Sequence, residues 1–312
     1  MSERPVQSKL NNALNILRQG DLRGSYAELE RLLKNDLENA EIDYTLKGVR
    51  FWEDRLEKAK KASTPLERAE MMISQWKSFL AYIHRQGEEK ESIIYSLKCA
   101  VFTIALEFYA ELFNEDSELP DAEPYRKIGL CYKVLGNYEK ALEFLRYAAE
   151  IDKNSGAVLA DLADCYALYG EIKFAKAFFR EAFFIDPEGI ELQFLESEII
   201  CRLINRVYNL GYRVEDIADW VPVYGVIDGV FNVKRELRAF EVGQLKQNIF
   251  LMEGEVQNAS QEQKHKLIPR LINHYFWQID HYVSVNENKS KIDDLLLRIK
   301  VLDQNIYNCY MR

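Results

Sequence analysis

The chain contains few of the residues that build disulfide-linked, metal-bound or loop-rich proteins. Its 312 residues include five cysteines, an odd number, and no Cys-x-x-Cys pair occurs among them. A disulfide framework or a thiolate metal site is therefore not expected, and the cysteines are predicted to be reduced thiols in the core. Glycine and proline are also scarce, at 14 and 7 residues, which favours long helices over sheets.

The chain also lacks an excess of positive charge. Its formal net charge of −9 disfavours general binding to nucleic acid, which needs a basic surface to displace counterions. An anionic membrane is disfavoured as the main partner for the same reason. The sequence shows no run of about 18 apolar residues and no secretory signal at its start. We therefore expect a cytoplasmic protein that binds neither nucleic acid nor membrane.

The sequence motifs of common enzymes are missing. There is no GxGxxG, GxxxxGK[ST], GxSxG or HExxH, and no cluster of cysteine and histidine. His274 and His281 lie two turns apart on one predicted helix, too far along its axis to bind one metal without other ligands. We expect no catalytic residue, no metal and no cofactor.

The sequence does contain a segment that recurs after 34 residues, first over 125–154 and again over 159–188. The equivalent positions include Cys131-Tyr132 and Cys165-Tyr166, Gly136 and Gly170, Ala141 and Ala175, Ala148 and Ala182, and Ile151-Asp152 and Ile185-Asp186. A unit of this size cannot bury its apolar face alone and must stack on neighbouring units.

The period and these signature positions resemble the tetratricopeptide repeat, clearly over residues 122–189 and more weakly over 6–51. The resemblance implies an all-α fold in which antiparallel helical hairpins stack as a right-handed solenoid. We expect small residues such as Gly129 and Ala141 to let paired helices approach closely. Large residues such as Tyr132 and Leu145 should fill the space between layers.

Helical periodicity continues on both sides of the repeats. Three regions are predicted: degenerate hairpins over 1–114, the repeat pair with a capping helix over 115–208, and a helical C-terminal region over 209–312. Outside the repeats we expect a helical hairpin over 8–35. Single helices are expected over 39–61, 65–85, 88–112, 189–208, 213–220, 232–253, 260–285 and 290–310. The acidic stretch 114–124 is expected to be a loop, and 221–231 is compatible with a buried loop or the start of a helix.

One late helix carries four large aromatic residues, Tyr275, Phe276, Trp277 and Tyr282. Together these residues make more of the helix surface apolar than is usual for a helix that faces solvent. The residues either form the core of the C-terminal region or provide a surface for self-association or a partner, and the core interpretation is favoured.

In tetratricopeptide repeat proteins, the first helix of each repeat lines a groove that holds a peptide or a partner helix. Carried onto this chain, the candidate groove residues are Arg126, Leu130, Lys133, Val134, Ala160, Asp161, Asp164 and Leu168. Arg126, Leu130 and Lys133 share one helix face, and the two cations suit an acidic or amphipathic segment. The alternative is a solvated helix face. The carboxylate clamp of chaperone-binding members is not matched, because Leu130, Asp161 and Asp164 break its pattern.

The resemblance predicts a non-enzymatic scaffold or adaptor that binds another protein or peptide. Three alternatives stay open: a sensor of a small molecule or signalling peptide, an assembly or export chaperone, and an enzyme with an unfamiliar site in the C-terminal region. Self-association into a homo-oligomer through the late helices is a further expectation.

Overall fold

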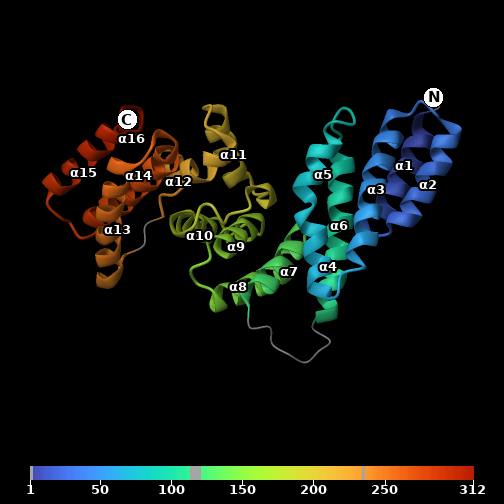
Figure 1. Cartoon of the computed structure of the whole chain (residues 1–312), viewed down its shortest axis with the longest axis horizontal. Coiled ribbons are helices and arrows are strands. Elements are labelled where there is room, and N and C mark those ends of the chain that lie inside the picture. Colours follow the sequence, from blue (N-terminus) through green and yellow to red (C-terminus); the bar gives the residue numbers. More distant parts are fainter. Residues whose placement is uncertain (1–2, 113–120, 234–235) are drawn as a thin grey trace. The chain divides into compact units, whose positions relative to one another are not determined.

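The computed structural model describes residues 3–112, 121–233 and 236–312, and every regular element in these ranges is a helix (Figure 1). The α-helices are α1 (Glu3–Arg18), α2 (Leu22–Asn35), α3 (Ala40–Ala59), α4 (Pro65–Ser74), α5 (Trp76–Ile83), α6 (Glu91–Leu112), α7 (Ala122–Val134), α8 (Tyr138–Ile151), α9 (Gly156–Leu168), α10 (Ile172–Ile185), α11 (Glu198–Asn209), α12 (Ile217–Ile227), α13 (Ala239–Asn258), α14 (Gln261–Ser284), α15 (Lys289–Leu302) and α16 (Gln304–Tyr310). Two short 3₁₀ helices, η1 (Leu192–Phe194) and η2 (Val214–Asp216), complete the set. The all-α class is confirmed for the described part of the chain.

The chain divides into two compact units, residues 1–148 and 149–312, and the boundary falls inside α8. The division into three regions expected from the sequence stays a prediction.

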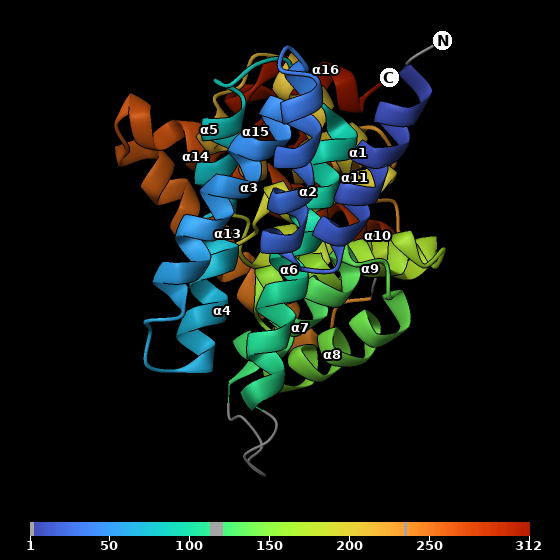
Figure 2. The same ribbon diagram turned by 90° about the vertical axis from the view of Figure 1, so that its right-hand side faces the viewer.

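In the N-terminal unit, α1, α2, α3 and α6 lie side by side (Figures 1 and 2). The α1–α2 hairpin turns at Gly20, whose φ of 86° is a conformation that suits glycine. At α4, Thr64 and Glu67 form the predicted capping box. The helix expected over 65–85 is interrupted at Gln75. The second piece, α5, places Trp76 against Trp52, with ring centroids 6.0 Å apart.

Helix α6 passes through the interior of this unit. By length and composition alone it is apolar enough to cross a membrane. In the structure it packs against α1, α3, α4 and α7, and 61% of its most apolar 18-residue stretch is buried. This packing is the arrangement of a core helix in a folded unit.

The two repeats have the same turn geometry at positions 34 residues apart. Gly136 and Gly170 adopt φ values of 78° and 96°, and each turn is closed by a backbone hydrogen bond to a tyrosine carbonyl. The bond runs from Asn137 to Tyr132 at 2.9 Å and from Glu171 to Tyr166 at 2.8 Å. This is the glycine-terminated helix end in which the residue after the left-handed glycine donates to an otherwise unpaired carbonyl. The repeat predicted from the sequence is therefore present in backbone detail.

Side-chain packing within each hairpin repeats as well. Tyr132 stacks on Phe144 at 5.6 Å, and the equivalent Tyr166 stacks on Phe178 at 5.5 Å. A Cβ added to Gly129 would lie 2.5 Å from Leu145 Cγ, so a larger residue would require Leu145 to shift where α7 approaches α8. The expectation that a small residue allows close approach at this position is confirmed.

In the C-terminal unit, α14 supplies much of the core. Tyr275, Phe276, Trp277 and Tyr282 are all buried, which confirms the core interpretation of the aromatic helix. The Ser260–Gln263 capping box at its start is also present. The undecided segment 221–231 is helical to Ile227, and Pro222 lies inside α12. The helix expected from 232 begins instead at Ala239, and Asp303 separates α15 from α16 by capping the second helix.

The helix expected over 189–208 is wrong in its first half. Residues 189–197 are not α-helical, and α11 begins at Glu198. Three backbone donors of this segment bond to side chains: Gly189 N–H donates to Asp186 at 3.1 Å, and Glu196 and Ser197 donate to Asp164. The Asp164 carboxylate thus satisfies two N–H groups that a helix over 189–208 would have paired internally.

Candidate functional site

The predicted groove residues of the first repeat are buried. Arg126, Leu130, Lys133 and Val134 lie on α7, and none exceeds 4% exposure. The Arg126 guanidinium donates to both carboxylate oxygens of Glu123, at 2.8 and 2.7 Å. A solvated helix face is therefore wrong for these residues, while their role in holding a partner stays a prediction.

Three groove residues of the second repeat, Ala160, Asp161 and Asp164, are also buried. Asp164 is fully enclosed, and its two oxygens accept the backbone N–H groups of Glu196 at 2.9 Å and Ser197 at 2.8 Å. The segment before α11 thus lies against this part of α9. Because sequence periodicity predicted a helix here, it gave no sign that this segment would cover α9.

Leu168, the last predicted groove residue, is half-buried and lines an open cleft of about 710 Å³ in the C-terminal unit. We name it the Leu168 cleft. Its apolar wall comes from the α9–α10 hairpin, from α11 and from the segment after α12: Ala167, Leu168, Ile172, Ile199, Leu203 and Val230. Its polar rim contains Lys176, Ser197, Glu198, Arg202, Arg206 and Asp228. The cleft is within the size range of sites that hold a ligand or a side chain.

Local sequence explains how this wall forms. The turn at Gly170 reverses the chain, so Leu168 at the end of α9 and Ile172 at the start of α10 lie on the same side of the hairpin. On α11, Ile199 and Leu203 are four residues apart and share one helix face. The resemblance placed the first helix of each repeat in the groove and did not predict the contributions of α10 and α11.

Some charged residues at the rim of the Leu168 cleft form ion pairs and one does not. Arg206 forms a 2.5 Å ion pair with Asp228 and lies over the Tyr224 ring, and Arg202 pairs with Glu198 on its own helix. Burial raises the pKa of the Asp228 carboxyl, although Arg206 opposes that shift. Lys176 has no ion pair with any residue in the described ranges and leaves one uncompensated positive charge beside the apolar wall.

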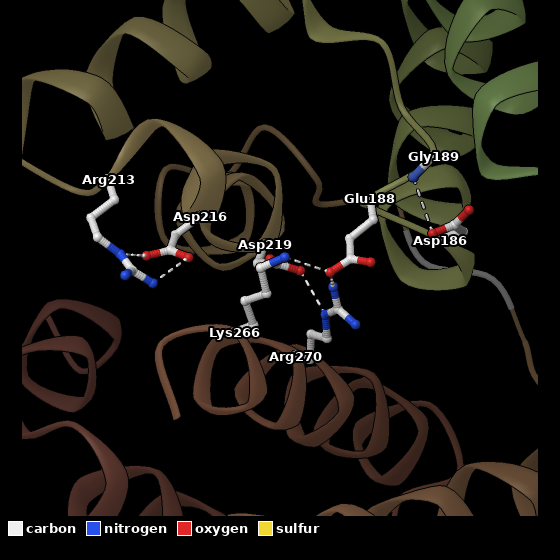
Figure 3. A network of polar contacts seen from close by, with 8 residues as sticks. All are labelled: Asp186, Glu188, Gly189, Arg213, Asp216, Asp219, Lys266 and Arg270. Atoms are coloured by element: carbon white, nitrogen blue, oxygen red, sulfur yellow. Dashed lines mark hydrogen bonds and ion pairs between the residues drawn. The ribbon is translucent and has the colours of Figure 1, made fainter. Parts of the chain in front are cut away.

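A separate polar network connects α14 with α12 and with the segment after α10 (Figure 3). Arg270 on α14 donates to Asp219 at 2.6 Å and pairs with Glu188 at 2.8 Å. Lys266, one turn earlier, also pairs with Glu188 at 2.8 Å. Burial raises the pKa of Asp219, whereas Lys266 and Arg270 lower the pKa of Glu188. The network therefore fixes three segments of the unit to one another.

The described residues hold no group of three or more histidine, cysteine, aspartate or glutamate side chains arranged to bind a metal. The five cysteines are free thiols, and burial raises the pKa of Cys131 far above its ordinary value. A thiol in this state is a poor nucleophile.

The family model described as tetratricopeptide repeat matches residues 135–198. The match begins in the turn before α8, includes α9 and α10, and ends at the start of α11. It includes Ala167, Leu168 and Ile172 of the Leu168 cleft wall, whereas Ile199, Leu203 and Val230 follow the matched residues. A comparison with curated proteins finds no match to the chain. Together with the repeated turns and ring stacks, the match shows that the chain contains tetratricopeptide repeats.

Proposed function

We propose that this protein is a non-enzymatic scaffold or adaptor that binds a peptide segment of another protein in the Leu168 cleft. The observation that carries the proposal is an open apolar cleft on the second repeat, with the unpaired charge of Lys176 at its rim. Tetratricopeptide repeats are an interaction fold, and stacked helices provide a rigid surface on which a peptide can bury its side chains.

The chemistry of the cleft favours a particular kind of peptide. Ile172, which is 44% exposed, and the buried Leu203 both line the cleft, so a large apolar side chain can replace water over this wall. Lys176 adds a preference for a carboxylate next to that apolar side chain, because an opposite charge compensates it. Binding needs little rearrangement, since the helices that form the wall are already in place.

A peptide-display selection against the full chain tests the proposal. We expect enriched peptides to combine a large apolar residue with a neighbouring acidic residue. The best peptide should bind Lys176→Glu about three- to tenfold more weakly in fluorescence polarisation. Lys173→Glu is the matched control, since Lys173 is exposed on the same helix but does not line the cleft. It should bind within about twofold of the wild type.

Two outcomes contradict the proposal. Equal weakening by Lys173→Glu and Lys176→Glu would mean that only general charge attraction was measured. Unchanged binding by an Ile172→Ser variant that keeps its helical circular dichroism would move the binding surface away from the cleft.

A further inference from the structure

The C-terminal unit contains a second cavity, distinct from the Leu168 cleft. Its volume is about 450 Å³, and four helices of the unit, α10, α12, α13 and α14, contribute to its lining. We name it the Asp219 cavity. The lining residues that matter here are Phe184, Asp219, Met252, Arg270, Asn273 and His274. Its size lies within the range of small-molecule sites.

Asp219 lines this cavity, and only one of its two carboxylate oxygens has a hydrogen-bond partner among the described residues. One oxygen accepts the Arg270 Nε–H at 2.6 Å, as Figure 3 shows, but Oδ2 is buried without a hydrogen-bond partner among the described residues. The residue is 1% exposed and lines the cavity, so a molecule bound there is placed to supply the missing partner. Leaving a buried charged acceptor unpaired is costly, so a bound donor would stabilise this oxygen.

Asn273, on the next turn of α14, also lines the cavity. It is 3% exposed, and no residue in the described ranges makes a hydrogen bond to its side-chain amide. A buried amide of this kind carries both donors and an acceptor that a bound molecule can satisfy. Two polar side chains on neighbouring helices therefore border one cavity with unused hydrogen-bonding capacity.

His274 is a third polar residue of this cavity, and its hydrogen bond shows which ring nitrogen carries the proton. Its Nδ1 is 2.8 Å from the Arg270 carbonyl oxygen, which can only accept, so Nδ1 carries the proton. Burial lowers the pKa of His274, which favours the neutral ring. In that state Nε2 is a hydrogen-bond acceptor.

The remaining wall is apolar and partly aromatic. Phe184 lies 4.7 Å from the His274 ring and 4.6 Å from the Trp277 ring, which fixes its orientation. Met252, on α13, supplies a flexible apolar side chain that can adjust to a bound molecule. This arrangement suits a flat apolar body.

The charges around the cavity are mainly negative. The carboxylates of Asp186, Asp219 and Glu255 line it, against the single guanidinium of Arg270. Arg270 is already shared between Asp219 and Glu188. The acceptors and the excess of carboxylates therefore favour a bound group that is positively charged and carries N–H donors.

We propose that the Asp219 cavity binds a small organic cation with a flat apolar body. The body lies against Phe184 and Met252, and the N–H groups donate to Asp219 Oδ2 and His274 Nε2. This site lies outside the proposed peptide cleft and does not depend on it.

Benzamidine, a flat ring with an amidinium head, is the probe, and benzoate is its control of matched shape and opposite charge. Isothermal titration and histidine-resolved NMR on the full chain measure binding. We expect benzamidine to bind and shift the His274 resonances, and benzoate to bind at least about tenfold more weakly because it lacks the donors.

Variants locate the site. Asp219→Asn should weaken benzamidine about tenfold, since it removes the charge and one acceptor. Because that change also weakens the contact with Arg270, Met252→Trp provides a second test that fills the cavity and leaves the polar groups intact. Met71→Trp is the matched control, placed at an exposed methionine of α4. Lys176→Glu should bind benzamidine as the wild type does, which separates this site from the Leu168 cleft.

The proposal is overturned if benzamidine leaves the His274 resonances unchanged at millimolar concentration. It is also overturned if benzoate binds equally well, or if a folded Met252→Trp variant keeps wild-type affinity. Loss of binding in Met252→Trp but not in Met71→Trp supports it.

Discussion

Asp164 provides the sharpest test of how the second repeat is held together. Its side chain is fully buried on α9, and its two oxygens accept the backbone N–H groups of Glu196 and Ser197. A hydrogen bond to a charged group contributes about 1.5–3 kcal/mol, so two such bonds amount to about 3–6 kcal/mol. We therefore expect Asp164→Ala to lower the free energy of unfolding by about 3–6 kcal/mol. Asp164→Asn keeps one acceptor oxygen and should lose about half as much.

Urea unfolding followed by circular dichroism measures the global effect, and amide hydrogen exchange measures it locally. In Asp164→Ala, the amides of Glu196 and Ser197 should lose protection first, because they lose their acceptor. Asp293→Ala is the control, since Asp293 is exposed on α15 and its loss should stay within about 0.5 kcal/mol. If Asp164→Ala unfolds within about 1 kcal/mol of the wild type, the assignment of a structural role to this residue is wrong. Asp164 would then return to the set of partner-binding candidates.

Two further changes follow from the contacts described above. Gly129→Ala places a Cβ 2.5 Å from Leu145 Cγ, so it should destabilise the N-terminal unit by about 1–3 kcal/mol in urea unfolding, and a neutral result would show that Leu145 can move aside. The pKa of Glu188 is lowered by Lys266 and Arg270, so its ion pairs stabilise the fold above the unfolded glutamate pKa of about 4.3 and are lost as pH falls through the lower folded value. The Tm difference between wild type and Glu188→Gln should therefore shrink as pH is lowered below about 4, and a difference that grows there would contradict the assignment.

The repeat and its turns were predictable because they depend on neighbours in the sequence. The 34-residue spacing of Tyr132 and Tyr166 predicted equivalent packing, and the structure contains equivalent ring stacks and turn hydrogen bonds. The helix starts at Thr64 and Ser260 were predictable for the same reason, since a capping box is completed within four residues.

The burial of the charged groove residues was not predictable from local pattern. Arg126, Lys133 and Asp164 occupy helix positions that periodicity alone assigns to a groove or to solvent, yet all three are buried. Asp164 is satisfied by backbone groups 32 and 33 residues away, in a segment whose apolar spacing indicated a helix. Local propensity cannot show which distant backbone donors will compete for a carboxylate.

The candidate cleft was predicted only in part. Leu168 was identified through the resemblance to tetratricopeptide repeats, but Ile172 and Lys176 belong to the second helix of the hairpin, which that resemblance does not place in the groove. The Asp219 cavity gave no sequence signal, because its four contributing helices are brought together only by the tertiary fold.

The two cysteines at equivalent repeat positions can report local opening of each repeat through their reactivity. Cys131 and Cys165 occupy equivalent positions, both are fully buried, and one belongs to each compact unit. Alkylating reagents attack the exposed thiolate, so each site becomes reactive only when its own hairpin opens. The labelling rates of these two native residues therefore compare the opening equilibria of two nearly equivalent hairpins within one molecule, without any introduced probe.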